Sequence, residues 1–145
     1  MRLAAAFCLG WLLASPAFAE TQPQPQTHEV KMYTRNAQGP MIYAPEFLHI
    51  APGDSVRFIP TQPSHNAATI DNMIPAQASP FRSQINEDFT VTLTEPGLYG
   101  IKCSPHYAMG MVMLIEVGEP TARELPDDLP PRARQRFEAI LEAAR

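Results

Sequence analysis

The stretch "FTVTLTEPGLYGIKCSPHYAMGMVMLIEVG", residues 89–118, decides how this chain can fold. Phe89, Val91 and Leu93 alternate with threonines, and this period of two is typical of a strand with one apolar and one solvated face. The turn sequence "EPG" follows, and two further apolar runs flank a loop that is rich in sulfur and imidazole side chains. The stretch therefore predicts β-structure with a cluster of soft metal ligands between its last two strands.

Short apolar runs of the same kind continue upstream, separated by glycine, proline, asparagine and aspartate. Seven or eight such strands favour an all-β, antiparallel sandwich. A chain of 145 residues suits one domain of this kind and leaves no room for a second, catalytic domain. The predicted strands cover about residues 29–34, 46–50, 55–60, 65–70, 89–94, 98–103 and 111–117.

The domain organisation follows from changes in composition along the chain. Residues 1–19 combine Arg2, an apolar run and the small-residue sequence "AFA", which predicts a secretory signal peptide. Residues 20–27 are rich in proline and glutamine and predict a disordered leader. We expect the sandwich over residues 28–118 and a helical extension over residues 119–145.

The predicted extension has two unlike halves. The first, "EPTARELPDDLPP", is charged, and its prolines are expected to allow at most one helical turn there. The second, "RARQRFEAILEAAR", has apolar residues at helical spacing and predicts one amphipathic helix packed on the sandwich. The prolines are Pro126, Pro130 and Pro131, and the apolar residues are Phe137, Ile140, Leu141 and Ala144.

Export would change both the charge and the cysteine content of the chain. Without Arg2, 10 basic residues face 15 acidic ones, and a net charge near −5 argues against nucleic acid as a partner. Cleavage also removes Cys8, so Cys103 becomes the single thiol in an oxidising compartment and an internal disulfide is excluded. A bound metal would protect this sulfur from oxidation. Because no other stretch approaches the ~20 apolar residues of a spanning helix, we expect no membrane insertion.

The two Pro-Gly turns indicate which histidine can lie near Cys103. The turn sequences "APGDS" and "EPG" each start a strand of five to seven residues that carries the chain about 20 Å away. His65 and Cys103 end these two strands and should therefore meet at the opposite pole. His49 precedes a turn and lies at the wrong end, and His28 is expected to be a solvated residue at the start of the first strand.

Cys103, His106 and Met111 form a C-x2-H-x4-M array, to which His65 adds a second imidazole. A thiolate, two imidazoles and a thioether match a type 1 copper site, in which one ion is held by His2Cys with a weak axial methionine. Zinc fits less well, because it does not select a thioether.

Each residue of the array also has a plainer interpretation. Cys103 can be a small buried apolar residue, and His106 taken alone is more often a surface histidine. Met111 shares strand parity with Met113, so core packing is the default for both methionines. Met109 is expected to be a surface apolar residue near the site. The complete array between two strands favours the copper site.

The segments "GPMIYAPEFLHIAPGDSVRFIP" and "HNAATIDNMIPAQASPFRSQINEDFTVTLTEPGLYGIKCSPHYAMGMV" closely resemble the pseudoazurins, type 1 copper proteins of the cupredoxin superfamily. The likeness runs from about residue 28 to 118. It implies a Greek-key β-sandwich of about eight strands with a plastocyanin-like copper site. It also implies that Asn66 holds the ligand loops together and offers a backbone N–H to the thiolate, and that Met41 lies close to the His106 ring.

The resemblance further implies a monomeric periplasmic one-electron carrier rather than an enzyme. Acceptors in this family include copper nitrite reductase, nitrous oxide reductase and cytochrome c peroxidase, and the donor is a cytochrome or membrane complex. His106 is expected to be the electron port, framed by Met41, Pro105 and Met109. The family usually surrounds this pole with lysines, whereas residues 20–145 contain only two lysines, Lys31 and Lys102. The candidate replacements are Arg35, Arg57 and Arg82.

Two other functions are compatible with parts of the pattern. A protein that stores or delivers copper would explain the methionine-rich loop, but it would favour more open and exchangeable ligands. A Cys-His hydrolase would use Cys103 as nucleophile and His106 as base. The sequence shows neither a third residue to orient the histidine nor a substrate cleft.

Overall fold

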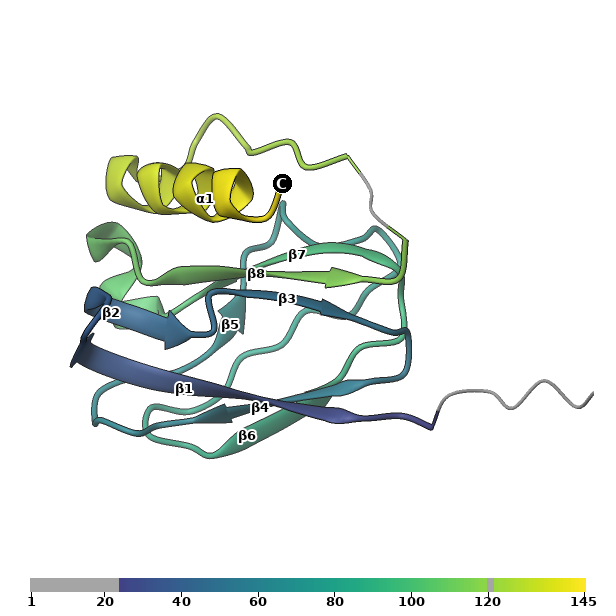
Figure 1. The fold of residues 1–145 in the computed structure, drawn as a ribbon, viewed down its shortest axis with the longest axis horizontal. Helices are drawn as coiled ribbons and strands as arrows, with labels where there is room; N and C mark the ends of the chain where they lie inside the picture. Colours follow the sequence, from purple (N-terminus) through teal and green to yellow (C-terminus); the bar gives the residue numbers. More distant parts are fainter. Residues whose placement is uncertain (1–23, 120–121) are drawn as a thin grey trace, which may run out of the picture.

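The computed structural model describes residues 24–119 and 122–145. Within these residues, two four-stranded sheets pack face to face, and the α-helix α1 covers the outer face of one of them (Figure 1). The predicted all-β sandwich of about eight strands with a C-terminal helix is therefore confirmed. The predicted signal peptide and residues 20–23 of the leader lie outside the described residues.

The first sheet has the strand order β2-β1-β4-β6. Its strands are β1 (Thr27–Asn36), β2 (Gly39–Ala44), β4 (Ser55–Ile59) and β6 (Phe89–Thr92). β1 begins at Thr27, one residue inside the predicted leader, because the Gln26 N–H donates to Asp54 Oδ1 at 2.8 Å. The end of the leader is thus ordered against the start of β4.

The second sheet has the order β3-β8-β7-β5. Its strands are β3 (Phe47–Ile50), β5 (Ala68–Thr69), β7 (Gly97–Lys102) and β8 (Val112–Val117). All six residues of β8 are buried, because the first sheet covers one face of this strand and α1 covers the other. This explains why β8 reads as a nearly continuous apolar run, in which Glu116 is the exception and is buried in an ion pair with Arg123.

Three details of the predicted sheet were wrong. β1 pairs with β4, and β3 pairs with β8, in parallel, so the sandwich is not purely antiparallel. β2 was missing from the predicted strands, because "GPMIYA" buries two adjacent residues and lacks alternation. The strand predicted at 65–70 contains only the two residues of β5, since His65 and Asn66 belong to the preceding loop.

α1 (Pro131–Ala143) packs its apolar residues on the outer face of β8. Phe137 and Ile140 are buried there, as the helical spacing predicted, but Ala144 lies just beyond the last turn. Pro131 does not interrupt a helix; it opens α1, at a position where its missing N–H has no cost. Among the described residues, no helix is both long and apolar enough to span a membrane.

The pole with the Pro-Gly turns carries the other two histidines. His28 Nε2 lies 2.8 Å from Asp54 Oδ2, so this residue is partly buried against a carboxyl partner and the predicted solvated position was wrong. The backbone N–H of Gln26, followed by the bond from His28, lowers the pKa of the Asp54 carboxyl. His49 is exposed, as expected at this end, and its Nε2 contacts the Gly118 carbonyl at 2.6 Å.

Candidate metal centre

The pole opposite these turns brings together the three strongest ligands of the predicted array. Cys103 Sγ lies 3.4 Å from His106 Nδ1 and 3.7 Å from His65 Nδ1, and the two Nδ1 atoms are 3.1 Å apart. The three atoms form a group of metal-ligand type within the described residues. Cys103 and His65 are fully buried, whereas His106 is only half-buried.

Backbone hydrogen bonds close the loop between β7 and β8 around these residues. The Cys103 N–H donates to the Met111 carbonyl at 3.0 Å, and the Met111 N–H donates to the His106 carbonyl at 3.2 Å. The 3-10 helix η1 (Ser104–Met109) lies between them, with Pro105 in its first turn. Gly110 ends η1 with φ 89°, a left-handed conformation that glycine adopts without steric cost.

Met111 is tied into this loop and is fully buried in the same apolar cluster as Cys103. Met109 is 46% exposed, in agreement with its predicted surface position. Met111 is therefore buried at this pole and Met109 lies on its surface, as the spacing indicated.

Asn66 joins the two ligand-bearing loops. Its Oδ1 accepts the Ser104 N–H at 2.8 Å, and its Nδ2 donates to Ser104 Oγ at 3.2 Å and to the Ser83 carbonyl at 3.1 Å. Its backbone N–H faces the Cys103 sulfur and acts to lower the pKa of this thiol. The bridging role that the resemblance implied for Asn66 is present in the structure.

Two contacts to the site were not anticipated from the sequence. Thr34 Oγ1 lies 2.9 Å from His65 Nε2, and with the Nε2–H donating to this hydroxyl the Nδ1 lone pair faces Cys103. The buried hydroxyl of Tyr43 donates to the Asn66 carbonyl at 2.7 Å. A tyrosine within an apolar run was the available signal for the second contact, because a buried phenol needs a hydrogen-bond partner.

The protonation of the cluster suits a soft metal ion. Burial raises the pKa of the Cys103 thiol, although the backbone N–H groups of Asn66 and His106 act in the opposite direction. Burial, followed by the charge of His106, lowers the pKa of His65, so this imidazole is neutral and available as a ligand. Burial and then the Cys103 charge raise the pKa of Tyr43, which therefore stays a hydroxyl donor. A cation that replaced the thiol proton would satisfy the buried sulfur.

The cationic surface differs from the predicted one. Arg57 does not replace a missing lysine, because its guanidinium binds both Asp88 carboxylate oxygens, at 2.8 and 2.7 Å. Arg35 and Arg82 are exposed. α1 adds the exposed Arg132, which lines a groove together with Met109 at the edge of the ligand loop, whereas Arg136 in the same groove is ion-paired with Glu46.

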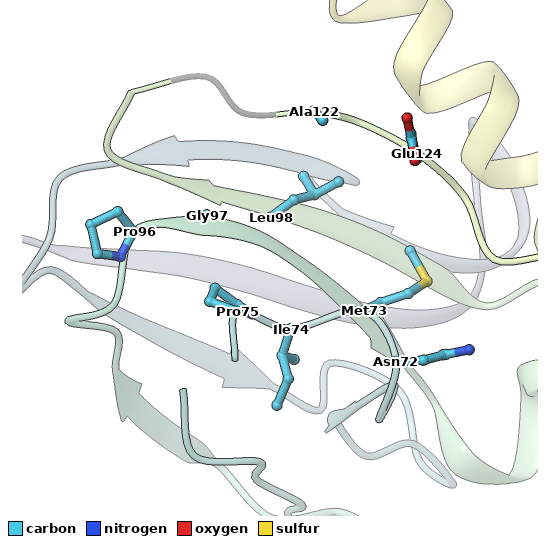
Figure 2. A pocket seen from close by; sticks show the side chains of 9 residues that line it. All are labelled: Asn72, Met73, Ile74, Pro75, Pro96, Gly97, Leu98, Ala122 and Glu124. Atoms are coloured by element: carbon cyan, nitrogen blue, oxygen red, sulfur yellow. The ribbon is translucent and has the colours of Figure 1, made fainter. Parts of the chain in front are cut away.

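A separate hollow of about 300 Å³ lies alongside β7, between residues 72–75 and residues 122–124. Figure 2 shows its lining, with Pro96 at one end and Asn72 at the other. Glu124 is its single titratable side chain, and none of the four predicted ligands lines it. The hollow therefore offers no partner for the chemistry of Cys103 and His106.

Comparison with known proteins gives the context of this site. Residues 29–118 match the sequence model of the copper binding proteins of the plastocyanin/azurin family. The chain is 44% identical to a pseudoazurin of Paracoccus pantotrophus over 144 residues, which cover 96% of this chain and 94% of the relative. The chain belongs to the pseudoazurin family.

Other pseudoazurins agree with this assignment. A putative pseudoazurin of Rhizobium leguminosarum bv. viciae is 44% identical over 117 residues, covering 79% of this chain and 77% of the relative. The crystal structure of pseudoazurin from Methylobacterium extorquens AM1 superposes with a TM-score of 0.76 at 31% identity, over 82% of this chain and 99% of that one. Pseudoazurins are electron-transfer cupredoxins, not enzymes, so the chain is a copper-binding electron carrier that works with redox partners.

Proposed function

We propose that the chain shuttles single electrons in the periplasm and that His65, Cys103, His106 and Met111 hold its one copper ion. The observation that carries this proposal is the buried triangle of one sulfur and two imidazole Nδ1 atoms, with sides of 3.1 to 3.7 Å. Bound copper supplies the one-electron chemistry by cycling between Cu(II) and Cu(I). The fit is supported by the donor set, which contains one buried thiol, two imidazoles and a buried thioether.

The surroundings of these residues favour fast electron transfer because they hold the ligands in one arrangement. Thr34 holds one imidazole through its Nε2, and Asn66 links the loop of His65 to the loop of Cys103. Backbone hydrogen bonds fix Met111 relative to Cys103 and His106. A rigid ligand set undergoes little rearrangement when an electron arrives or leaves.

Electrons are proposed to enter and leave at the His106 ring. This ligand is half-buried, whereas the other two members of the triangle are fully buried, so its edge is the one nearest to solvent. Met109 is 46% exposed in the same loop and gives the port an apolar border. Pro105 is exposed beside it, and Met41 is proposed to complete the border. A small apolar patch of this kind suits brief encounters.

The finer physiological assignment also belongs to this proposal. The sequence at residues 1–19 has the features of an export signal and supports a periplasmic location for a monomeric carrier. Candidate acceptors are copper nitrite reductase, nitrous oxide reductase and cytochrome c peroxidase, and the candidate donor is a cytochrome or membrane complex. The low lysine content makes the exposed arginines of the pole the cations that would steer such partners.

Voltammetry of the copper-loaded protein in the presence of a copper chelator tests the carrier function. We expect a reversible one-electron wave, with the metal retained in both oxidation states over many cycles. The alternative function, copper storage or delivery, predicts that the chelator or an acceptor protein removes the ion at each cycle. Rapid loss of copper from the reduced protein would therefore contradict the carrier proposal.

A further inference from the structure

Tyr43 is fully buried, yet its hydroxyl makes a single well-defined hydrogen bond. The hydroxyl donates to the Asn66 backbone carbonyl at 2.7 Å, from strand β2 to the loop that carries His65. The ring packs edge-on against Phe58, with centroids 6.1 Å apart and an interplanar angle of 73°. Position and orientation of the phenol are therefore set by the core, independently of the ligand loops.

The residue that receives this hydrogen bond follows His65 in the chain and is bonded to the loop that carries Cys103. The side chain of Asn66 binds Ser104, the neighbour of Cys103, and the Ser83 carbonyl, and its backbone N–H acts to lower the pKa of the Cys103 thiol. Neither of these side-chain partners lies in a strand, since Ser104 opens η1 and Ser83 belongs to a loop. The Tyr43 hydroxyl therefore fixes residue 66, in the loop before β5, relative to strand β2 of the other sheet.

We propose that Tyr43 is a positioning residue of the metal centre: through the Asn66 carbonyl it aims the Asn66 N–H at the Cys103 sulfur and so raises the reduction potential. A hydrogen bond to sulfur stabilises the more negative sulfur of the Cu(I) state, so any loosening of residue 66 favours Cu(II). Only the φ and ψ rotations of residue 66 separate the carbonyl that Tyr43 holds from the N–H that meets the sulfur. This inference rests on the proposed copper ligation.

Tyr43→Phe tests the proposal because it removes one oxygen and keeps the ring against Phe58. We expect copper to bind through the same ligands, but the affinity for Cu(I) relative to Cu(II) should fall about threefold. For a one-electron couple this corresponds to a reduction potential that is lower by about 28 mV. The sulfur-to-copper absorption band should move to longer wavelength, because a sulfur that has lost hydrogen-bond strength gives up charge more readily.

Tyr99→Phe is the matched control. Tyr99 is also buried, and its hydroxyl also donates to a backbone carbonyl, that of Glu95, at 2.8 Å. This bond lies at the turn pole, away from the copper ligands. The control should lose stability in the same way but keep the wild-type potential and band position. Equal potentials for Tyr43→Phe and wild type, or equal shifts in both variants, would overturn the proposal.

A measurement on the wild-type protein covers the case in which Tyr43→Phe does not fold. In NMR spectra of the reduced, diamagnetic protein, the Tyr43 hydroxyl proton and the Asn66 amide proton should both exchange slowly with water. Rapid exchange of either proton would refute the positioning role. The proposed function fails separately, if wild-type protein with added copper lacks the thiolate-to-copper band.

Discussion

Gly110 offers the sharpest test of how α1 is joined to the ligand loop. Its φ of 89° is unfavourable for other residues, and a Cβ added here would lie 3.0 Å from the Arg132 carbonyl oxygen and 3.3 Å from the carbonyl carbon. Both atoms belong to the backbone of the first turn of α1, so they cannot move aside as a flexible side chain would. Gly110→Ala therefore combines conformational strain with a forced displacement of the helix.

Gly53 allows the two costs to be separated. It has a similar φ of 95°, but a Cβ added there meets no atom within 4 Å. Left-handed alanine costs about 1–2 kcal/mol, of which about 0.4–1 kcal/mol is recovered through the lower entropy of the unfolded chain. Gly53→Ala should thus lose about 1 kcal/mol. Gly110→Ala should lose about 2–3 kcal/mol, since crowding in a packed region adds at least about 1 kcal/mol.

Thermal and urea unfolding of the copper-free variants measure the difference, because bound metal would otherwise add its own stabilisation. At about 3–4 °C per kcal/mol for a domain of this size, Gly110→Ala should melt at least about 3 °C below Gly53→Ala. Equal stabilities of the two variants would refute the close packing of α1 on the ligand loop.

Three further substitutions test the site and the opposite pole. Met111→Leu should keep copper bound but raise the potential in voltammetry, because loss of a weak axial donor disfavours Cu(II); a lower potential would count against Met111 as a ligand. Pro105→Ala supplies a new backbone N–H near the sulfur and should raise the potential by about 60 mV, if that N–H favours Cu(I) by about 1.4 kcal/mol; no change would leave proline with a role in loop stiffness alone. Asp54→Asn should remove one component of the acid sensitivity of the fold. The pKa of Asp54 is lowered in the folded protein, so the carboxylate contributes its full stabilisation above the unfolded pKa of about 3.9. This stabilisation is lost as the pH falls through the lower pKa of the folded state. Urea unfolding of copper-free protein should show the two proteins converging below about pH 4, and a gap that stays constant down to pH 2.5 would contradict this assignment.

Much of the fold could be predicted because strand alternation and turns are local features of the sequence. The Pro-Gly turns placed His65 and Cys103 at one pole, and the structure puts His65 Nδ1 3.7 Å from the sulfur. The helix around Phe137 followed from its spacing in the same way. These patterns depend on neighbours within a few residues, so the rest of the chain does not alter them.

The features that escaped prediction depend on contacts between distant strands. β2 lacks alternation because residues 42 and 43 are both buried, one of them beneath the ligand loops. Thr34 meets His65 only through the relative placement of β1 and the 65–67 loop, which no local pattern encodes. His28 appeared solvated because its partner, Asp54, lies 26 residues away and is aligned by the parallel pairing of β1 with β4.

Addition of one equivalent of Cu(II) to the copper-free protein, followed by visible absorption, tests the type 1 copper site formed by His65, Cys103, His106 and Met111. We expect an intense thiolate-to-copper band in the wild-type protein and its absence in Cys103→Ser, because a hydroxyl cannot supply the covalent copper–sulfur bond. Both proteins should unfold cooperatively, which shows that the fold is intact. A colourless wild-type complex, or an intense band that persists in Cys103→Ser, would contradict the proposed copper site.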